Sequence, residues 1–252
     1  MVRVTRTIAV ANQKGGVAKT TTVASLGSAL AEQGRKVLLV DLDAQSCLTF
    51  SLGLDPEAVE LSVHDVLLGR IGAAMAIHAT EDGVDLLPAT IELAGTEAQL
   101  LSRPGREFVL RTALEEVSAA YDVVLLDCSP SLGVLTLNAL TAADEVIIPL
   151  QCEMLSHRGV GQLLDTIHDV QRILNPGLRV LGVLPTMYDG RTNHARAVLA
   201  DVSGRYGLHV MEPIPKSVRF AEAPAAGRSV LATARRTRGA EAYRALAEGL
   251  FS

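Results

Sequence analysis

The chain has 252 residues, of which 48% are apolar, and a mean hydropathy of +0.28, which suits one large α/β domain with a sizeable core. No run approaches the roughly 18 uncharged apolar residues of a membrane span. The apolar run after Met1 is also too short for a signal peptide, so a cytoplasmic protein is expected. The net charge of −5 does not indicate a nucleic-acid binder, although residues 186–252 carry ten basic against six acidic side chains.

The N-terminal half alternates short apolar runs with segments of helical periodicity. A buried strand begins at Ile8, a glycine-containing loop follows it, and residues 20–32 are predicted to form a helix. The same two patterns predict strands at 37–41 and 83–88 and helices at 62–68, 92–101 and 107–119.

The C-terminal half continues this alternation. Strands are expected at 121–127, 143–150, 179–185 and 209–214, and helices at 159–174, 193–206 and 239–250. Strands that alternate with helices predict an α/β fold with a single doubly wound, mainly parallel sheet flanked by helices. No linker or internal repeat divides the chain, so one domain over residues 1–252 is predicted.

The loop between the first strand and the first helix has the composition of a phosphate-binding loop. Its sequence is Lys14-Gly-Gly-Val-Ala-Lys-Thr-Thr21. Backbone N–H groups of such a loop and the following helix N-terminus face the same spot, where they bind anions. Lys19 would contact the β- and γ-phosphates, and the Thr20 hydroxyl would bind Mg²⁺.

This loop departs from the strict pattern G-x-x-x-x-G-K-[ST] at Gln13 and Ala18. Alanine adds a methyl group where the backbone approaches phosphate, but it adopts helical φ/ψ readily, so the loop is expected to keep its function. A site that demands a positive φ at Ala18 would weaken the nucleotide interpretation.

Three acidic residues end or follow predicted strands near the loop: Asp41, Asp43 and Asp127. Ligands of parallel sheets bind beyond the carboxyl ends of the strands, so these side chains are expected near the phosphates. Asp127 follows four consecutive apolar residues and fits a Walker B acid that holds Mg²⁺ mainly through water.

Four segments together resemble the ParA/Soj-type chromosome and plasmid partition ATPases, part of the ParA/MinD group of P-loop ATPases with a deviant Walker A motif. The segments are Ala11-Asn-Gln-Lys-Gly-Gly-Val-Ala-Lys-Thr-Thr, Val40-Asp-Leu-Asp-Ala-Gln45, Asp127-Cys-Ser-Pro-Ser-Leu-Gly and Ile214-Pro-Lys-Ser-Val-Arg-Phe-Ala-Glu-Ala-Pro224. They occur in the family's order, and the similarity covers nearly the whole chain.

The resemblance implies roles for individual residues. Lys14 is the signature lysine that reaches the partner's phosphates in a dimer, Asp43 orients the attacking water, and Pro215 is the candidate for adenine contact. The implied catalytic residues are Lys14, Lys19 and Asp43, and the implied magnesium site is Thr20, Asp43 and Asp127. The implied nucleotide contacts are Lys14, Gly15, Gly16, Val17, Ala18, Lys19, Thr20, Thr21, Asp127 and Pro215.

Ala18, Ala44 and Ser129 depart from residues that are usual in the family. Ala44 and Ser129 stand where proline is frequent, and proline fixes φ, so these two changes alter loop stiffness more than chemistry. They are expected to affect the rate of hydrolysis more than nucleotide binding.

The resemblance also implies the biological role. The protein would be a slow, Mg²⁺-dependent ATPase that dimerises on ATP, binds double-stranded DNA nonspecifically and segregates chromosomes or plasmids with a ParB-like partner. It would then lie on the nucleoid in the cytoplasm. Arg191, Lys216 and Arg219 are the candidate DNA contacts, and such contacts act by counterion release without a base-reading motif.

Two alternatives stay open from the sequence. A MinD-like, membrane-cycling regulator would end in a basic amphipathic helix, whereas the last thirteen residues here contain two glutamates and one arginine. An orphan ParA-like protein that positions another cargo with weak ATPase activity is the other alternative, and the substitution at Ala18 keeps it open.

Overall fold

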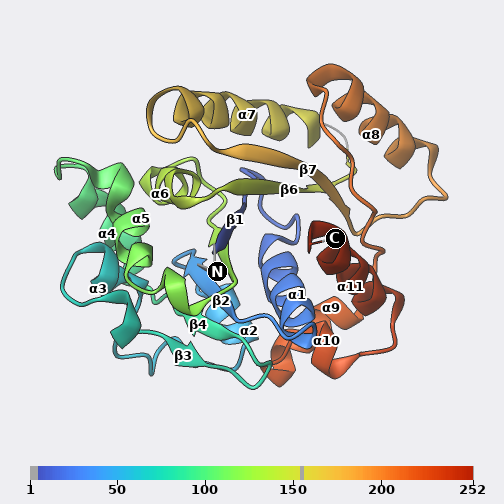
Figure 1. Cartoon of the computed structure of the whole chain (residues 1–252). Helices are drawn as coiled ribbons and strands as arrows, with labels where there is room; N and C mark the ends of the chain where they lie inside the picture. The colour runs from blue at the N-terminus through green and yellow to red at the C-terminus, as the bar shows by residue number, and fades with distance from the viewer. Residues whose placement is uncertain (1–4, 154–155, 252) are drawn as a thin grey trace.

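The computed structural model describes residues 5–153 and 156–251, and a seven-stranded sheet with helices on both faces forms its centre (Figure 1). The strands are β1 Arg6–Val10, β2 Val37–Leu42, β3 His78–Ala79, β4 Asp85–Leu87, β5 Val123–Cys128, β6 Glu145–Gln151 and β7 Arg179–Thr186. Their order is β3-β4-β2-β5-β1-β6-β7, and every pairing is parallel except β3 with β4. The predicted fold class is confirmed.

Helices cover each face of the sheet and bury both sets of strand side chains. One face packs against α3 Val63–Leu67, α4 Leu93–Leu100, α5 Val109–Glu115, α6 Val134–Ala142, α7 Ser156–Ile173 and α8 Asn193–Tyr206. The other packs against α1 Lys19–Glu32, α2 Cys47–Ser51, α9 Arg219–Glu222, α10 Val230–Thr233 and α11 Arg238–Phe251. Short 3₁₀ turns lie at Ala73–Met75, Arg106–Phe108, Ser118–Ala120 and Ala223–Ala226.

The central strands are apolar on both faces because both faces are covered, as is typical of parallel sheets. Ile8 and Val10 point toward the α1 side, and Ala9 between them points toward the α6 side. Helix α1 lies very close to β2, since a Cβ at Gly27 would come within 2.7 Å of Leu39. This close packing fixes the helix that follows the phosphate loop.

The strand predicted at 209–214 is wrong. This segment runs beside β7 and forms one isolated bridge, between Val210 and Val183. Backbone hydrogen bonds also join Met211 to Val183 and Ile214 to Pro185. Pro213 has no N–H group, so these bonds do not form a continuous ladder. Helix α6 was not predicted, because it is apolar all round and has no amphipathic period, which is typical of a buried helix.

Among the helices of the described residues, none combines the length and the apolar composition that crossing a bilayer would require.

Candidate functional site

The loop between β1 and α1 opens onto a cavity of about 800 Å³ at the carboxyl ends of the strands. Gly15, Gly16, Ala18, Lys19, Thr20 and Thr21 form its phosphate-loop wall. Gly16 has φ +73°, a conformation that side chains rarely adopt, and a Cβ built on either glycine meets open space. The loop therefore presents bare backbone to the cavity, as anion binding requires.

Hydrogen bonds to two distant strands, β6 and β7, hold the loop in place. The Asn12 amide donates to the Pro149 carbonyl of β6 at 2.7 Å, and its oxygen accepts from the Lys14 N–H at 2.9 Å. The Thr186 hydroxyl at the end of β7 donates to the Val17 carbonyl at 3.0 Å. Val17 itself is buried, so it supports the loop through packing and does not line the cavity.

Ala18 does not have the right-handed helical conformation that the sequence suggested. Its φ and ψ are 64° and 35°, in the left-handed region, and the Thr22 N–H donates to its carbonyl as α1 begins. A left-handed conformation costs an alanine about 1–2 kcal/mol. That expectation was wrong because the flanking tethers, rather than the intrinsic preference of alanine, set the conformation at this turn. A positive φ at Ala18 was expected to weaken the nucleotide interpretation, yet Ala18 still lines the cavity together with Lys19 and Thr20.

Lys19 is largely buried and lines the cavity. Its ammonium donates to the Lys14 carbonyl at 3.2 Å. Burial lowers the pKa of this ammonium, although the nearby Asp127 carboxylate opposes the shift. Lys19 is therefore a buried cation without a bonded counter-ion among the described residues, and a phosphate group would supply one.

The three predicted acids meet at neighbouring strand ends but have different surroundings. Asp41 and Asp127 are register partners on β2 and β5, and both are buried. Asp41 accepts hydrogen bonds from the Thr49 N–H and hydroxyl and from the Asp43 N–H, so its role in this structure is to hold the strand end. Burial raises its pKa to about 6.

Asp127 is the acid with unmet hydrogen-bonding capacity. Neither of its buried carboxylate oxygens has a well-formed hydrogen bond. Burial and the Asp41 carboxylate raise its pKa well above the ordinary value, whereas Thr20 and Lys19 act in the opposite direction. A buried, orphaned carboxylate beside a threonine hydroxyl is suited to a hard cation such as Mg²⁺ and its bound water.

Asp43 lies on the cavity wall, where one of its oxygens accepts from the Gln45 N–H at 3.0 Å. The described residues contain no group of three or more His, Cys, Asp or Glu side chains that could hold a metal by themselves. This fits Mg²⁺, which is usually bound by one or two carboxylates together with substrate phosphates and water.

Part of the cavity lining is apolar, and sequence reasoning missed most of it. This apolar part consists of Met187, Ile214, Phe220, Pro224 and Tyr243. Phe220 packs edge-on against Tyr243, with ring centroids 5.8 Å apart. Such a surface suits a planar base. Phe220 lies in the segment 214–224, which the sequence already singled out. The only sequence signal at Tyr243 is the ordinary helical periodicity of the last predicted helix.

Four predicted nucleotide contacts do not line the cavity, namely Lys14, Val17, Asp127 and Pro215. Val17 and Asp127 are buried. Pro215 does not line the cavity, although its neighbours Ile214 and Lys216 do. Lys14 does not line it either, because its ammonium turns outward to the Glu153 carboxylate at 2.6 Å.

The candidate DNA contacts Arg191 and Arg219 come from two segments that run side by side. Tyr188 and Pro215 form a parallel bridge, which joins the two segments. Each arginine is paired with a local carboxylate, Arg191 with Asp189 and Arg219 with Glu222. Both guanidinium groups are exposed, and Lys216 lies between them in sequence, at the mouth of the cavity.

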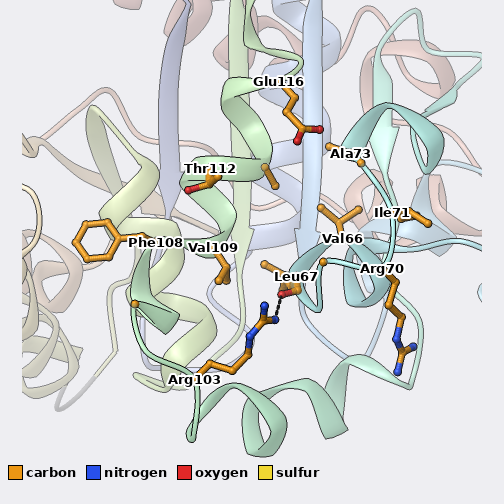
Figure 2. Close-up of a pocket in the computed structure, with 14 residues that line it drawn as sticks. Val66, Leu67, Arg70, Ile71, Ala73, Arg103, Phe108, Val109, Thr112 and Glu116 are labelled. Carbon is orange, nitrogen blue, oxygen red and sulfur yellow. Dashed lines mark hydrogen bonds between the residues drawn. The ribbon is translucent and has the colours of Figure 1, made fainter.

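A second cavity, of about 470 Å³, lies between α3 and α5, away from the phosphate loop (Figure 2). Arg103 points across it and donates to the Leu67 carbonyl at 3.1 Å, while Glu116 lies at the other end. The glycine loop and the strand-end acids do not contribute to it, so it is not the candidate nucleotide site.

Known proteins resemble this chain over nearly its full length. The AAA domain family matches residues 5–180. The sporulation initiation inhibitor protein Soj of Bacillus subtilis is 46% identical over 243 residues, which cover 96% of each chain. The chromosome partitioning protein ParA of Caulobacter vibrioides is 44% identical over 251 residues, covering 98% of this chain and 94% of its own length.

A solved structure from Mycobacterium smegmatis, named cobyrinic acid a,c-diamide synthase, contains ADP and magnesium. It is 58% identical and superposes with a TM-score of 0.89, covering 98% of this chain and 94% of its own.

Proposed function

The chain belongs to the ParA/Soj family of P-loop partition ATPases, and we propose that it dimerises on ATP, binds duplex DNA nonspecifically and segregates chromosomes or plasmids with a ParB-like partner. Membership of this family makes it an ATP hydrolase that uses Mg²⁺. The observation that supports the proposal is the cavity at the strand ends, whose lining includes Lys19, Thr20 and Asp43. The working unit is one domain over residues 1–252, active on the nucleoid in the cytoplasm.

In this proposal the loop amides and Lys19 bind the β- and γ-phosphates. Thr20 and Asp127 would hold Mg²⁺, which would supply positive charge to neutralise the phosphoryl oxygens. Asp43 accepts a hydrogen bond from the attacking water and orients it. The apolar part of the cavity lining, with Met187 and Phe220, would receive the adenine base.

Lys14 acts on the partner's nucleotide rather than on its own. Support comes from its position, because its ammonium lies outside the cavity that its own loop builds. A second subunit that faces the cavity mouth would receive this charge beside its γ-phosphate. Each subunit would thus complete the other's site, and hydrolysis would weaken the dimer.

DNA binding in this proposal uses Arg191 and Arg219, with Lys216 beside them. These cations would exchange their local carboxylates for DNA phosphates, and the exchange costs little because exposed ion pairs are weak. Counterion release then supplies the affinity. Dimerisation doubles the number of such contacts, so the ATP state binds DNA more tightly than the ADP state.

The direct test measures binding to a nonspecific duplex by filter retention or gel shift, with ATP and then with ADP. The proposal predicts saturable binding with ATP and much weaker binding with ADP. Equal binding in both states, or none in either, defeats the DNA part of the proposal.

A membrane-cycling role has less support than DNA binding. Helix α11 buries Tyr243 and Ala247 in the core, and Arg6 and Arg35 both stack on the ring of Phe251. The apolar face that a lipid-binding helix needs is therefore already used within the fold. A vesicle co-sedimentation assay with anionic lipid tests this alternative.

A second candidate function follows from the name of the solved relative from Mycobacterium smegmatis, which denotes synthesis of cobyrinic acid a,c-diamide. Incubation of this protein with ATP, Mg²⁺, glutamine and cobyrinic acid, followed by mass spectrometry, distinguishes the two functions. Amide formation would favour the synthase, and DNA-dependent nucleotide cycling without amide formation favours partition.

A further inference from the structure

The side chain of Lys14 has a definite partner within its own subunit. Its ammonium lies 2.6 Å from a carboxylate oxygen of Glu153, and both side chains are partly exposed, at 38% and 52%. The hydrogen bond to Lys14 lowers the pKa of the Glu153 carboxyl, so the carboxylate form of Glu153 is favoured. Lys14 is therefore held by a charge-assisted contact and is not a freely moving surface lysine.

The backbone brings these two residues together from opposite parts of the sequence. Asn12 ties the phosphate loop to the Pro149 carbonyl and also accepts from the Lys14 N–H. Glu153 lies two residues beyond β6, where its N–H donates to the Gln151 carbonyl at 2.8 Å. Both partners are thus anchored to the carboxyl end of the same strand, which makes the contact local and reproducible.

We propose that Glu153 is a positioning residue that holds Lys14 away from the nucleotide site in the single subunit and must release it when two subunits join. This inference rests on the proposed function, in which Lys14 reaches the partner's phosphates. The carboxylate and the partner's γ-phosphate compete for one ammonium group. Because an ammonium on a flexible stem reorients easily, the exchange needs only side-chain rotation.

This competition predicts the direction in which the stability of the dimer should change when Glu153 is replaced. The Lys14–Glu153 pair is present in free subunits and broken in the dimer, so it favours free subunits. Replacement of Glu153 by glutamine removes this stabilisation and should tighten the ATP-dependent dimer. Two exposed pairs are broken per dimer, so the dimer dissociation constant should fall by about two- to twentyfold. High salt screens such pairs, and the difference from wild type should shrink between about 0.05 and 0.5 M salt.

The experiment measures the dimer dissociation constant with ATP and Mg²⁺ by analytical ultracentrifugation for wild type, Glu153→Gln and the control Glu115→Gln. Glu115 pairs with Arg111 on α5, so this control makes the same charge change in an exposed ion pair outside the phosphate loop. A dimer that is tighter than wild type for Glu153→Gln alone, by a factor that shrinks as salt rises, supports the inference. An unchanged or weaker dimer for this variant overturns it, provided that wild type dimerises on ATP. Failure of wild type to dimerise overturns the proposed function itself.

A second measurement tests the contact in the free subunit. Without nucleotide, acetylation of Lys14 by acetic anhydride is followed by mass spectrometry, with the exposed Lys36 as internal reference. Because Glu153→Gln releases Lys14, the acetylation rate of Lys14 should rise severalfold in this variant. The acetylation rate of Lys36 should not change. Equal rates at Lys14 in both proteins would show that Glu153 does not hold it, and the inference would be rejected.

Discussion

The hydroxyl groups of Tyr243 and Thr22 lie 3.0 Å apart and join the last helix of the chain to the helix that begins at the phosphate loop. Tyr243 is completely buried, belongs to the apolar part of the cavity lining and packs against Phe220. A single side chain therefore connects the apolar part of the candidate nucleotide site with the first turns of α1. The hydrogen bond thus anchors α1, the helix that follows the phosphate loop, to the C-terminal helix α11.

Tyr243→Phe removes one hydroxyl and leaves the buried Thr22 hydroxyl without this partner. The free energy of unfolding should fall by about 1–2 kcal/mol, since a buried polar group that loses its hydrogen bond bears its desolvation cost. Urea unfolding followed by circular dichroism measures the change. Tyr188→Phe is the control, because no hydrogen bond of the Tyr188 hydroxyl is present among the described residues, and it should change stability by less than about 0.5 kcal/mol.

Asp43→Ala separates binding from chemistry. The variant should bind ATP and dimerise as wild type does, whereas hydrolysis should fall by at least about a hundredfold, because the water loses its orienting acceptor. Single-turnover hydrolysis and nucleotide titration measure the two effects separately. Hydrolysis at the wild-type rate would remove Asp43 from its proposed role.

Asp127→Asn should alter stability in a pH-dependent way. The folded-state pKa of Asp127 is raised by burial, so its contribution to stability is fully present below the ordinary pKa near 4 and is lost as pH rises through the folded pKa. Asparagine does not titrate, so the Asp127→Asn variant does not lose this stability as pH rises. Its stability relative to wild type, measured without nucleotide, should therefore increase with pH from about 4 upward.

The control for that series is Asp201→Asn, which removes an exposed carboxylate that pairs with Arg205 on α8. The difference between this variant and wild type should stay nearly constant with pH. A flat profile for Asp127→Asn would contradict the assignment of an unpaired buried carboxyl. Magnesium-dependent nucleotide binding should also weaken in Asp127→Asn.

Ala18→Gly should relieve the left-handed strain at the end of the phosphate loop. Glycine adopts this conformation without the steric cost, and the relief exceeds the added entropy of the unfolded chain, so stability should rise by up to about 1 kcal/mol. Ala98→Gly, at an exposed position inside α4, is the matched control and should lower stability by about 1 kcal/mol. The same sign for both changes would argue against strain at Ala18.

Arg191→Ala and Arg219→Ala should each weaken DNA binding equally on all sequences. Each should also reduce the slope of log K against log salt by about 1, because each removes one phosphate contact. Arg172→Ala on α7 is the control, since it breaks an exposed pair with Asp169 elsewhere on the surface. Salt-dependent filter binding with ATP gives the slopes. Unaltered slopes in both variants would exclude these arginines from the DNA surface.

The sequence predicted the parts of the site whose signals are local. A strand, two glycines, Lys19 and Thr20 lie within one short stretch, and the acids follow recognisable apolar strands. The parallel order of β1, β5 and β2 then brings these stretches together, as the alternation of strands and helices implied.

The remainder depends on tertiary packing. The conformation of Ala18 follows from tethers to β6 and β7, and Tyr243 reaches the cavity because α11 packs against α1. The Lys14–Glu153 pair joins a loop near the N-terminus to the end of a strand far along the chain. None of these relationships has a periodicity or motif in the sequence, so only the folded structure reveals them.

The central claim is that the loop from Lys14 to Thr21 binds the polyphosphate of a nucleotide. A titration of the protein with a fluorescent ATP analogue and Mg²⁺, followed by anisotropy up to millimolar concentration, tests it most directly. Saturable binding that Lys19→Ala reduces by at least about tenfold is the predicted result, because a buried phosphate would lose its cation. The absence of saturable binding in wild type would contradict the claim.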